Sequence, residues 1–224
     1  METHPANNAN LIPIMLQFAA MLGPRWPIVL LTSRENWSIP RSLAFRRLVD
    51  AKRISIMFLP NGTSFPTHDS VSEWLASSWL WEQFENSDRM LMFQSDSVLC
   101  SKSSVALDDF LEWDLIGAPI NPIYGQGYNG GLSLRNTKMM LNITRANSID
   151  EKFEDQWFYH QAMALGAKLP PVEVASRFSV ETVWAEEPLG YHQPHRWWQG
   201  DQIAMIESWC PETLLIKGPG RFHQ

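Results

Sequence analysis

Two patterns of apolar residues alternate along the first half of the chain. The segment from Leu11 to Leu22 has helical spacing and meets a stop signal at Gly23-Pro24. The β-branched and leucine-rich runs from Pro27 to Thr32 and from Ile54 to Leu59 predict buried strands, with a helix over Ser42 to Val49 between them. Because strand and helix alternate, the pattern predicts an α/β chain with a mostly parallel central sheet flanked by helices.

A later strand is predicted to end in a carboxylate. A helix from the capping pair Ser70 and Glu73 to about Phe84 precedes it. The segment Leu91 to Cys100 then reads Leu-Met-Phe-Gln-Ser-Asp-Ser-Val-Leu-Cys, which predicts a buried parallel strand that presents Asp96 at its end. Ligands of open α/β sheets bind beyond such strand ends, so Asp96 is a candidate for holding a metal ion or a ligand hydroxyl. The alternative is that Asp96 caps the next helix.

Four glycines occur between Gly125 and Gly131, just before the short apolar run Leu132 to Arg135. Glycines permit the backbone conformations and close approaches that a loop lining a sugar or phosphate pocket requires. The spacing does not match GxGxxG, and a strand follows instead of a phosphate-binding helix, so this is not a dinucleotide fingerprint. A plain hairpin loop is the alternative interpretation.

Two further segments carry candidate polar chemistry. Glu154 and Asp155 open a helix predicted from Phe153 to Ala164, where they either complement the helix dipole or orient a substrate hydroxyl. His192 lies in a proline- and aromatic-rich turn, where an imidazole is either structural or a transition-metal ligand. The four carboxylates between Asp108 and Asp114 are interpreted as a solvated face rather than as a second metal site.

Composition and charge narrow the class of protein. The 224 residues are 45% hydrophobic and 19% charged, which is enough to bury the core of one domain over residues 1–224. The net charge of −6 and the absence of a basic run argue against a nucleic-acid partner. The apolar segment from Leu11 to Leu22 is too short to span a membrane, so the chain as given is expected to be soluble.

Cysteines and glycosylation motifs bear on the compartment. Only Cys100 and Cys210 occur, without zinc-site spacing, although one bridge between them stays open. Asn-x-Ser/Thr sequons at Asn36, Asn61 and Asn142 leave a secretory-pathway lumen, such as the Golgi, open as the location of a full-length form.

The order of these parts resembles the nucleotide-sugar-dependent glycosyltransferases of the A-type fold. In those enzymes an Asp-x-Asp motif ends a strand, an Asn-Ser/Gly-Gly loop lines the donor-sugar site, and a late His completes the metal shell. By that resemblance Gln94-Ser95-Asp96 stands where Asp-x-Asp would, and Asn129, Gly130 and Gly131 line the donor site. The resemblance also implies that Asp96 and His192 hold Mn²⁺, or else Mg²⁺.

The whole chain is similar to a fungal family known as a domain of unknown function, DUF5672. The segments that carry this resemblance are Phe93 to Ser97, Ile116 to Pro119, Tyr128 to Arg135 and Pro188 to His192. Two departures from the transferases stand out. Gln94 replaces the first Asp, and an amide is a neutral, weaker ligand for a divalent ion. The start Met1-Glu2-Thr3-His4 resembles the loop after the first strand, so that strand and part of the nucleotide-base pocket are expected to be truncated.

The resemblance implies transfer of a sugar from a nucleotide-diphosphate donor to a carbohydrate or glycoconjugate acceptor. It also implies that Asp155 or Glu154 positions the acceptor hydroxyl and, in an inverting reaction, acts as the base. Trp157, Trp184 and Trp197 are candidates for stacking on a sugar face. Two alternatives stay open. One is a catalytically inactive carbohydrate-binding or scaffold protein of the same fold, and the other is a metal-dependent phosphoester hydrolase.

Overall fold

A computed structural model of the protein describes residues 1–5 and 9–217. The strands are β1 Ile28–Thr32, β2 Ile54–Phe58, β3 Arg89–Phe93, β4 Ser97–Leu99, β5 Leu115–Pro119, β6 Tyr128–Asn136, β7 Ser179–Val180 and β8 Gly190–His192. The helices are α1 Leu11–Leu22, α2 Leu43–Asp50, α3 His68–Leu75, α4 Ser78–Gln83, α5 Thr137–Ala146, α6 Glu154–Ala164, α7 Val172–Phe178, α8 Pro194–Trp197 and α9 Gly200–Trp209, with 3₁₀ turns η2 Leu107–Phe110 and η3 Pro211–Ile216.

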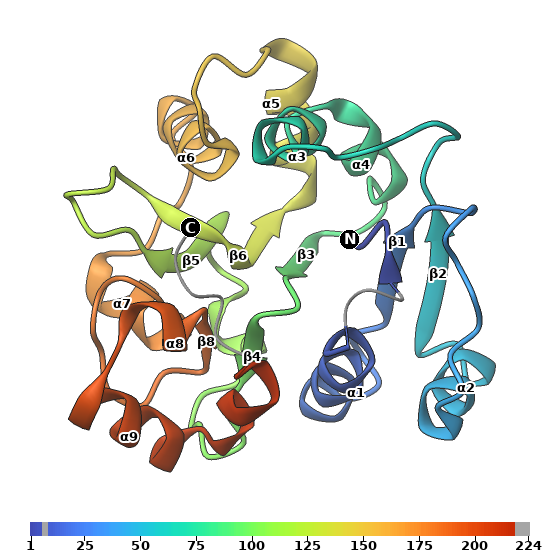
Figure 1. Cartoon of the computed structure of the whole chain (residues 1–224). Helices are drawn as coiled ribbons and strands as arrows, with labels where there is room; N and C mark the ends of the chain where they lie inside the picture. The colour runs from blue at the N-terminus through green and yellow to red at the C-terminus, as the bar shows by residue number, and fades with distance from the viewer. Residues whose placement is uncertain (6–8, 218–224) are drawn as a thin grey trace.

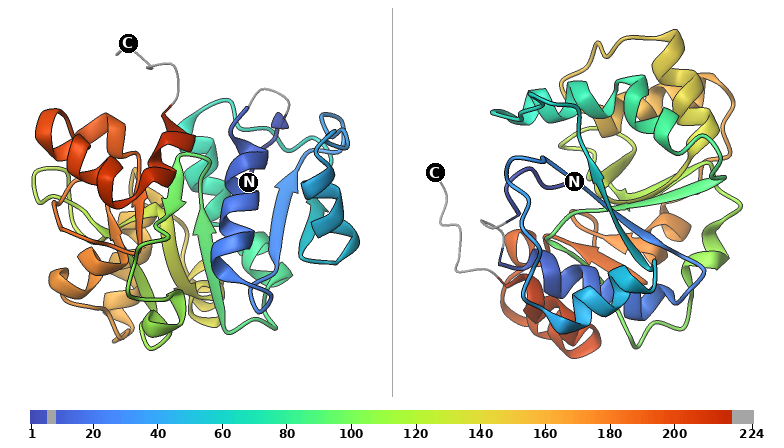
Figure 2. Two further views of the ribbon diagram at one scale, coloured as in Figure 1. Left: turned by 90° about the horizontal axis from the view of Figure 1, so that it is seen from below. Right: turned by 90° about the vertical axis from the view of Figure 1, so that its right-hand side faces the viewer.

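Helices cover both sides of the strands (Figure 1). In Figure 2, α1, α2 and α9 lie on one side of the strands, and α3, α4, α5 and α6 lie on the other. The buried apolar side chains of these layers form one continuous core. The mixed α/β architecture predicted from the sequence is confirmed.

The prediction of a mostly parallel central sheet is wrong. The strands form three hydrogen-bonded groups with the orders β1-β2, β3-β6-β5 and β4-β8-β7. Among the described strands, only the pairs β1/β2 and β7/β8 are parallel, whereas β6 runs antiparallel to both β3 and β5. The chain returns directly from β5 into β6 through residues 120–127, and such a short connection joins antiparallel neighbours. The strand that ends at Phe93 is therefore antiparallel to its partner and only half-buried.

The helices and strands predicted between Leu11 and Leu59 are confirmed, and the causes of two helix boundaries are visible. Helix α1 ends where Gly23 adopts a φ of 68°, a conformation that favours glycine. Helix α2 begins where the Ser42 hydroxyl accepts a hydrogen bond from the backbone N–H of Phe45. At the edge of β1 that faces away from β2, the N–H of Glu2 donates to the carbonyl of Leu31. The truncated first strand stays a prediction.

The single helix predicted from Ser70 to Phe84 is instead two helices, α3 and α4. The capping box is formed by Thr67 and Ser70, not by Ser70 and Glu73. The break falls at Ser77, whose hydroxyl donates to the carbonyl of Trp74 at 2.6 Å. Serine side chains that bond nearby backbone groups compete with the helix, which explains the interruption.

The glycine-rich segment is divided between a loop and a strand. Gly125 and Gly127 have φ values of 142° and 97° in the loop between β5 and β6. The prediction that Asn129, Gly130 and Gly131 form a loop is wrong, because all three lie within β6. Gly130 and Gly131 therefore serve close approach of neighbouring side chains rather than an unusual backbone conformation.

Cys100 and Cys210 form a disulfide that joins the end of β4 to the end of α9. The bridge that the sequence left open is thus present. Among residues 1–5 and 9–217, no helix combines the length and the apolar character that a membrane crossing requires.

Candidate functional site

Strand pairing brings Asp96 and His192 together. β4 runs antiparallel to β8 with Ser97 opposite His192, so the residue before β4 meets the end of β8. Gln193 then takes a left-handed conformation with φ 48°. Its backbone N–H donates to the carbonyl of Asp96 at 3.0 Å, and its side-chain Nε2 donates to Oδ2 of Asp96 at 2.8 Å. The Asp96 carboxylate is therefore oriented by the turn that follows His192.

The His192 imidazole lies between two carboxylates. Its Nε2 is 3.4 Å from Oδ1 of Asp96 and 3.2 Å from Oε1 of Gln94, while its Nδ1 is 3.0 Å from Oε1 of Glu181. Burial alone would lower the pKa of His192, but the two carboxylates outweigh burial and raise the pKa to about 9. Burial would raise the pKa of Asp96, yet the neighbouring His192 and Gln193 hold it below its usual value.

Gly131, the second residue of the Gly130-Gly131 pair, contacts the cluster formed by Gln94, Asp96 and His192. Its carbonyl accepts hydrogen bonds from the backbone N–H of Gln94 at 2.8 Å and from the Ser97 hydroxyl at 2.8 Å. A Cβ at Gly131 would overlap the His192 imidazole. Only glycine at this position leaves room for the ring to face Asp96. The backbone N–H of Gly131 donates a hydrogen bond to Oδ1 of Asn129 at 2.7 Å, so the amide oxygen of Asn129 already has a partner.

A buried ion pair lies on the other side of the glycine pair. Nη2 of Arg135 is 3.3 Å from Oε1 of Glu154, and the Arg135 side chain is only 1% exposed. The guanidinium is also packed against the rings of Trp81 and Phe158. Burial raises the pKa of Glu154 to about 7, although the Arg135 charge opposes this rise. A Cβ at Gly130 would be 2.6 Å from Nη2 of Arg135 and 3.0 Å from Oε1 of Glu154.

Asp155 is half-buried beside the same glycine. Its Oδ2 accepts a hydrogen bond from the N–H of Gly130 at 3.2 Å, and its Oδ1 accepts one from the N–H of Gln156 at 2.8 Å. Burial raises the pKa of Asp155, and the charge of Glu181 adds to that rise. The structure therefore brings every predicted site residue into one region, with Gly130 and Gly131 between the Asp96–His192 cluster and the Glu154–Asp155 cluster.

The metal-ligating capacity of the region is limited. Over the described part of the chain, no three His, Cys, Asp or Glu side chains are grouped so that they alone could hold a metal ion. The groups that face one another are a carboxylate oxygen of Asp96, an amide oxygen of Gln94 and an imidazole nitrogen of His192. Oδ1 of Asp96 is buried and faces Nε2 of His192 at 3.4 Å, without a regular hydrogen bond. This donor set suits manganese, provided that the imidazole gives up its proton.

Of the three candidate stacking tryptophans, one is excluded. Trp157 is fully buried in the core, so its ring cannot meet a sugar. Trp184 lines a cavity of about 750 Å³ whose wall also includes Tyr191. Adjacent strand residues point to opposite faces, so this cavity and His192 lie on opposite sides of β8.

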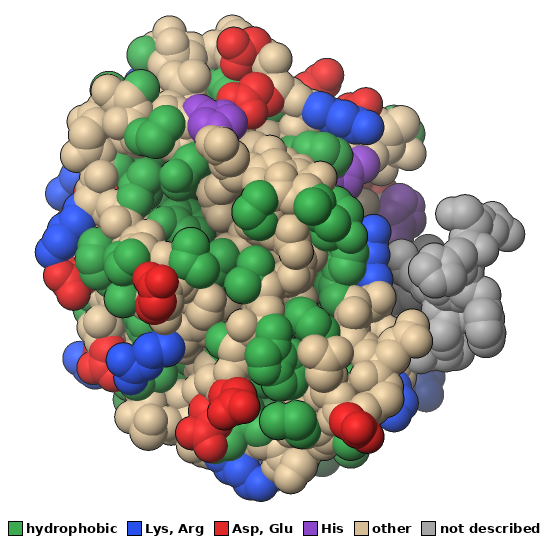
Figure 3. Space-filling model, turned by 90° about the vertical axis from the view of Figure 1, so that its left-hand side faces the viewer, with side chains coloured by type: hydrophobic (Ala, Val, Ile, Leu, Met, Phe, Trp, Pro, Cys, Tyr) green, Lys and Arg blue, Asp and Glu red, His purple; other side chains and the backbone are tan. Residues whose placement is uncertain are grey.

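The third tryptophan, Trp197, pairs with Tyr124 at a ring distance of 5.3 Å. The carbonyl of Tyr124 accepts a hydrogen bond from Nε2 of Gln156, the residue next to Asp155. The side chain of Tyr124 is 51% exposed, and that of the preceding Ile123 is 77% exposed. Figure 3 shows the face that carries the β5–β6 connection and α6, with mostly hydrophobic side chains over its middle. An aromatic surface therefore adjoins the start of α6.

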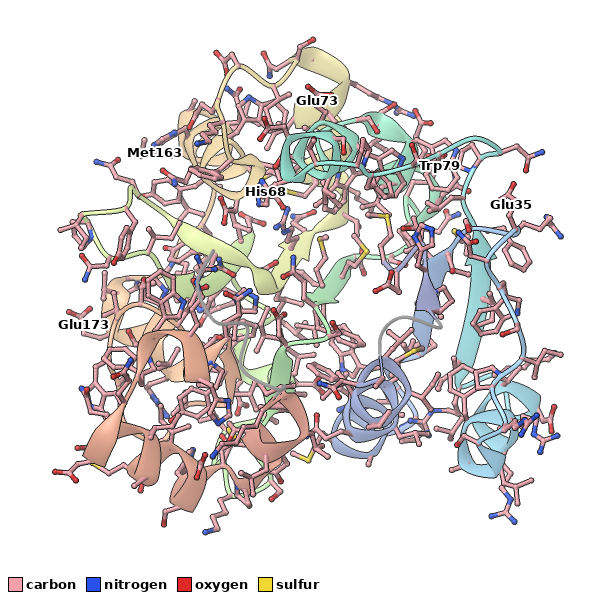
Figure 4. All side chains as sticks on the ribbon, in the orientation of Figure 1. Glu35, His68, Glu73, Trp79, Met163 and Glu173 are labelled. Carbon is pink, nitrogen blue, oxygen red and sulfur yellow. A yellow bond between two sulfur atoms is a disulfide. The ribbon has the colours of Figure 1, made fainter. Side chains whose placement is uncertain are left out.

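Helix α3 covers the residue that precedes Glu154. His68 lies at the start of α3 (Figure 4), and its ring contacts that of Phe153 edge-on at a centroid distance of 5.7 Å. This contact brings α3 to the start of α6, where Glu154 and Asp155 lie.

The acidic run between β4 and β5, predicted to be a solvated face, is exposed at Asp109 and Glu112 and half-buried at Asp108 and Asp114. Asp108 pairs with Arg25, Asp109 caps the N–H of Ala106, and Glu112 pairs with Lys168. Asp114 accepts hydrogen bonds from Asn136 and from the N–H of Lys168. Each carboxylate thus has its own partner.

Two residues of the region were missed by sequence reasoning. Glu181 follows the two-residue strand β7, which is too short to show a periodic pattern. Arg135 could have been recognised from the sequence. It is a charged residue in an apolar strand that contains the buried Leu132 and Leu134, and a buried charge requires an acidic partner. Glu154 is that partner.

Comparisons with known proteins give a family and a distant structural likeness. A family model described as "Protein of unknown function (DUF5672)" matches residues 53–192. Among solved structures, the chain is similar to the glycosyltransferase GlyE of Streptococcus pneumoniae TIGR4, with a TM-score of 0.39 and 16% sequence identity. That alignment covers 95% of this chain, which spans 64% of the GlyE chain. No curated protein matches the sequence.

Proposed function

This chain belongs to the DUF5672 family of proteins of unknown function, and we propose that it is a metal-dependent glycosyltransferase of the A-type fold. It would move a sugar from a nucleotide-diphosphate donor to a carbohydrate or glycoconjugate acceptor. The observation that carries the proposal is the convergence of Asp96, Gln94 and His192 beside the Gly130-Gly131 pair, next to the carboxylates that open α6.

Asp96 and His192 would hold a divalent ion, with Gln94 as a neutral third ligand. When bound, Mn²⁺ or Mg²⁺ would neutralise the charge that develops on the diphosphate leaving group. Glu181 would fix the imidazole from behind, because a hydrogen-bonding group on Nδ1 directs Nε2 toward Gln94 and Asp96. With one carboxylate and one amide among the ligands, the protein alone would bind the ion weakly.

The donor sugar would lie against Gly130 and Gly131. Both glycines lack side chains where a Cβ would collide with Arg135, Glu154 or His192, so they let both clusters approach the β6 backbone. The Oδ1 of Asn129 is occupied by the N–H of Gly131, which leaves its amide NH₂ to donate to a sugar hydroxyl.

Asp155 is better placed than Glu154 to orient the acceptor hydroxyl. It is half-buried and has a raised pKa, which makes its carboxylate a stronger base. Glu154 is buried in an ion pair with Arg135. This ion pair would fix the start of α6 and the position of Gly130. The exposed Tyr124 and the neighbouring Trp197 would offer the acceptor an aromatic surface beside Asp155.

The test is release of nucleotide from a panel of nucleotide sugars, with and without manganese and with and without candidate acceptor glycans. Release that depends on one donor and on manganese supports the proposal. Asp96→Asn should abolish that release, whereas Asp88→Asn, which removes an exposed carboxylate of a surface ion pair, serves as the matched control.

Two results would favour the alternatives. Binding of a nucleotide sugar or glycan without any release would indicate an inactive carbohydrate-binding or scaffold protein of the same fold. The doubly paired His192, whose imidazolium competes with a metal ion, is the feature that favours this alternative. Hydrolysis of simple phosphoesters without a donor sugar would indicate a hydrolase.

A further inference from the structure

The disulfide between Cys100 and Cys210 indicates the kind of cellular compartment in which the chain folds. Both residues are fully buried, and the bond closes a loop across 110 positions of the chain. They are the only two cysteines in the sequence, so both are consumed by this bond. Structural disulfides of this kind form and persist in oxidising compartments and are rare in reducing ones.

The three sequons give an independent observation. Asn36, Asn61 and Asn142 are all exposed, so each amide is accessible in the folded protein. Asn side chains are mostly exposed in folded proteins, so this exposure permits modification of the three sites. None of the three belongs to the Asp96–His192 or Glu154–Asp155 cluster.

The surroundings of Asn61 leave space for a bulky group. Asn61 lies in the exposed turn after β2, where the hydroxyl and N–H of Thr63 both donate to the carbonyl of Pro60. A Cβ built on the neighbouring Gly62 would meet no atom within 4 Å. A glycan on the Asn61 amide would therefore extend into open solvent without displacing any side chain.

Asn36 is the second site that the structure accommodates. It lies after β1, and its Nδ2 donates to the carbonyl of Thr3 at 3.0 Å. A glycosylated amide keeps one N–H, so this hydrogen bond can persist after modification. Because β1 and β2 are parallel, the loops with Asn36 and Asn61 lie at the same end of that pair.

We propose that this protein matures in an oxidising, N-glycosylating lumen and carries N-linked oligosaccharides on Asn61 and Asn36. The co-reactant is a lipid-diphosphate-linked oligosaccharide. A bond forms between the Asn Nδ2 and the anomeric carbon of the sugar, and the bond from that carbon to the diphosphate oxygen breaks. The amide loses one proton, and the lipid diphosphate leaves. This inference does not depend on the proposed transferase activity.

The experiment uses the protein isolated from its natural source. After thiol alkylation without reduction and proteolysis, the peptides are treated with peptide N-glycosidase in heavy-oxygen water and analysed by mass spectrometry. The expected result is a disulfide-linked peptide pair containing Cys100 and Cys210, with heavy-oxygen Asp at positions 61 and 36. Alkylated Cys100, or unmodified Asn61, would overturn the proposal.

Matched variants expressed in the same source separate modification from folding. Thr63→Ala destroys the sequon and should remove one glycan from the intact protein. Thr63→Ser keeps the sequon and should retain that glycan. Intact masses of the two variants that differ only by the one oxygen atom between Ser and Ala would also overturn the assignment of Asn61.

Discussion

Oε1 of Glu181 lies 3.0 Å from Nδ1 of His192, on the side of the imidazole opposite Asp96 and Gln94. Glu181 thereby orients the imidazole ring, and Nε2 of His192 faces Asp96 and Gln94. By the resemblance to the transferases, Asp96 would bind the metal ion and both residues would bind the donor. Both carboxylates contribute to the raised pKa of His192.

We predict that Glu181→Gln lowers the pKa of His192 from about 9 by roughly 1–3 pH units, because one of two neighbouring negative charges is removed. An NMR titration of the His192 ring proton, assigned by comparison with His192→Asn, measures this value. Glu173→Gln, an exposed acidic residue on α7, is the control and should leave the pKa unchanged. An unchanged His192 pKa in the Glu181 variant would show that this carboxylate does not act on the ring.

Gly131→Ala should displace His192, because the added Cβ would overlap the imidazole. We expect a loss of stability of roughly 1–3 kcal/mol and a fall in manganese affinity of about tenfold or more. Gly166→Ala is the control, since a Cβ there meets nothing within 4 Å and only the φ of 71° is unfavourable. Thermal melting and metal titration of both variants measure the effects. Equal manganese affinity in the two variants would contradict this account.

Much of the fold followed from local pattern, whereas the assembly of the site did not. Helix α1 and strands β1 and β2 were predictable because periodic apolar residues are bounded by Gly23, Pro27 and similar signals. The pairing of β6 with β3 was not, because these two strands are distant in sequence.

The candidate site shows the same division. Asp96 and His192 could be named by resemblance to a motif order, while Glu181 could not, since it follows a strand of only two residues. The role of Gly131 depends on its distance to His192, and only the folded chain shows that distance.

The raised pKa of Glu154 predicts how stability depends on pH. The pKa rises from 4.5 to about 7 on folding, so the folded protein retains a proton that the unfolded chain releases between these pH values. Stability is therefore lost as the pH rises through this window. Glu154→Gln removes the titrating group, so its stability relative to wild type should be roughly 3 kcal/mol more favourable at about pH 8 than at about pH 4. Denaturant unfolding at both pH values measures the difference, and a pH-independent difference would contradict the prediction.

Trp197→Ala should weaken acceptor binding without affecting the donor, because Trp197 contacts Tyr124, whose carbonyl is hydrogen-bonded to Gln156 in the first turn of α6. Loss of one stacking surface predicts a rise in the acceptor KM of roughly tenfold, with an unchanged Kd for the nucleotide sugar. Trp113→Ala, which removes a half-buried ring near Lys168, is the control. A parallel rise in donor Kd would place Trp197 at the donor rather than at the acceptor.

The most direct test of the central claim is a titration of manganese with and without a nucleoside diphosphate. Because Gln94 contributes no charge, the phosphates should supply the missing anionic ligands, and each ligand should tighten the other by the same factor. We predict coupling of about tenfold or more in the wild-type protein, most of which is lost in Asp96→Asn and part of which is lost in His192→Ala. Gln94→Asp should raise manganese affinity without nucleotide. Identical manganese affinity in both titrations, or wild-type coupling in Asp96→Asn, would remove Asp96 from the site and contradict the proposed function.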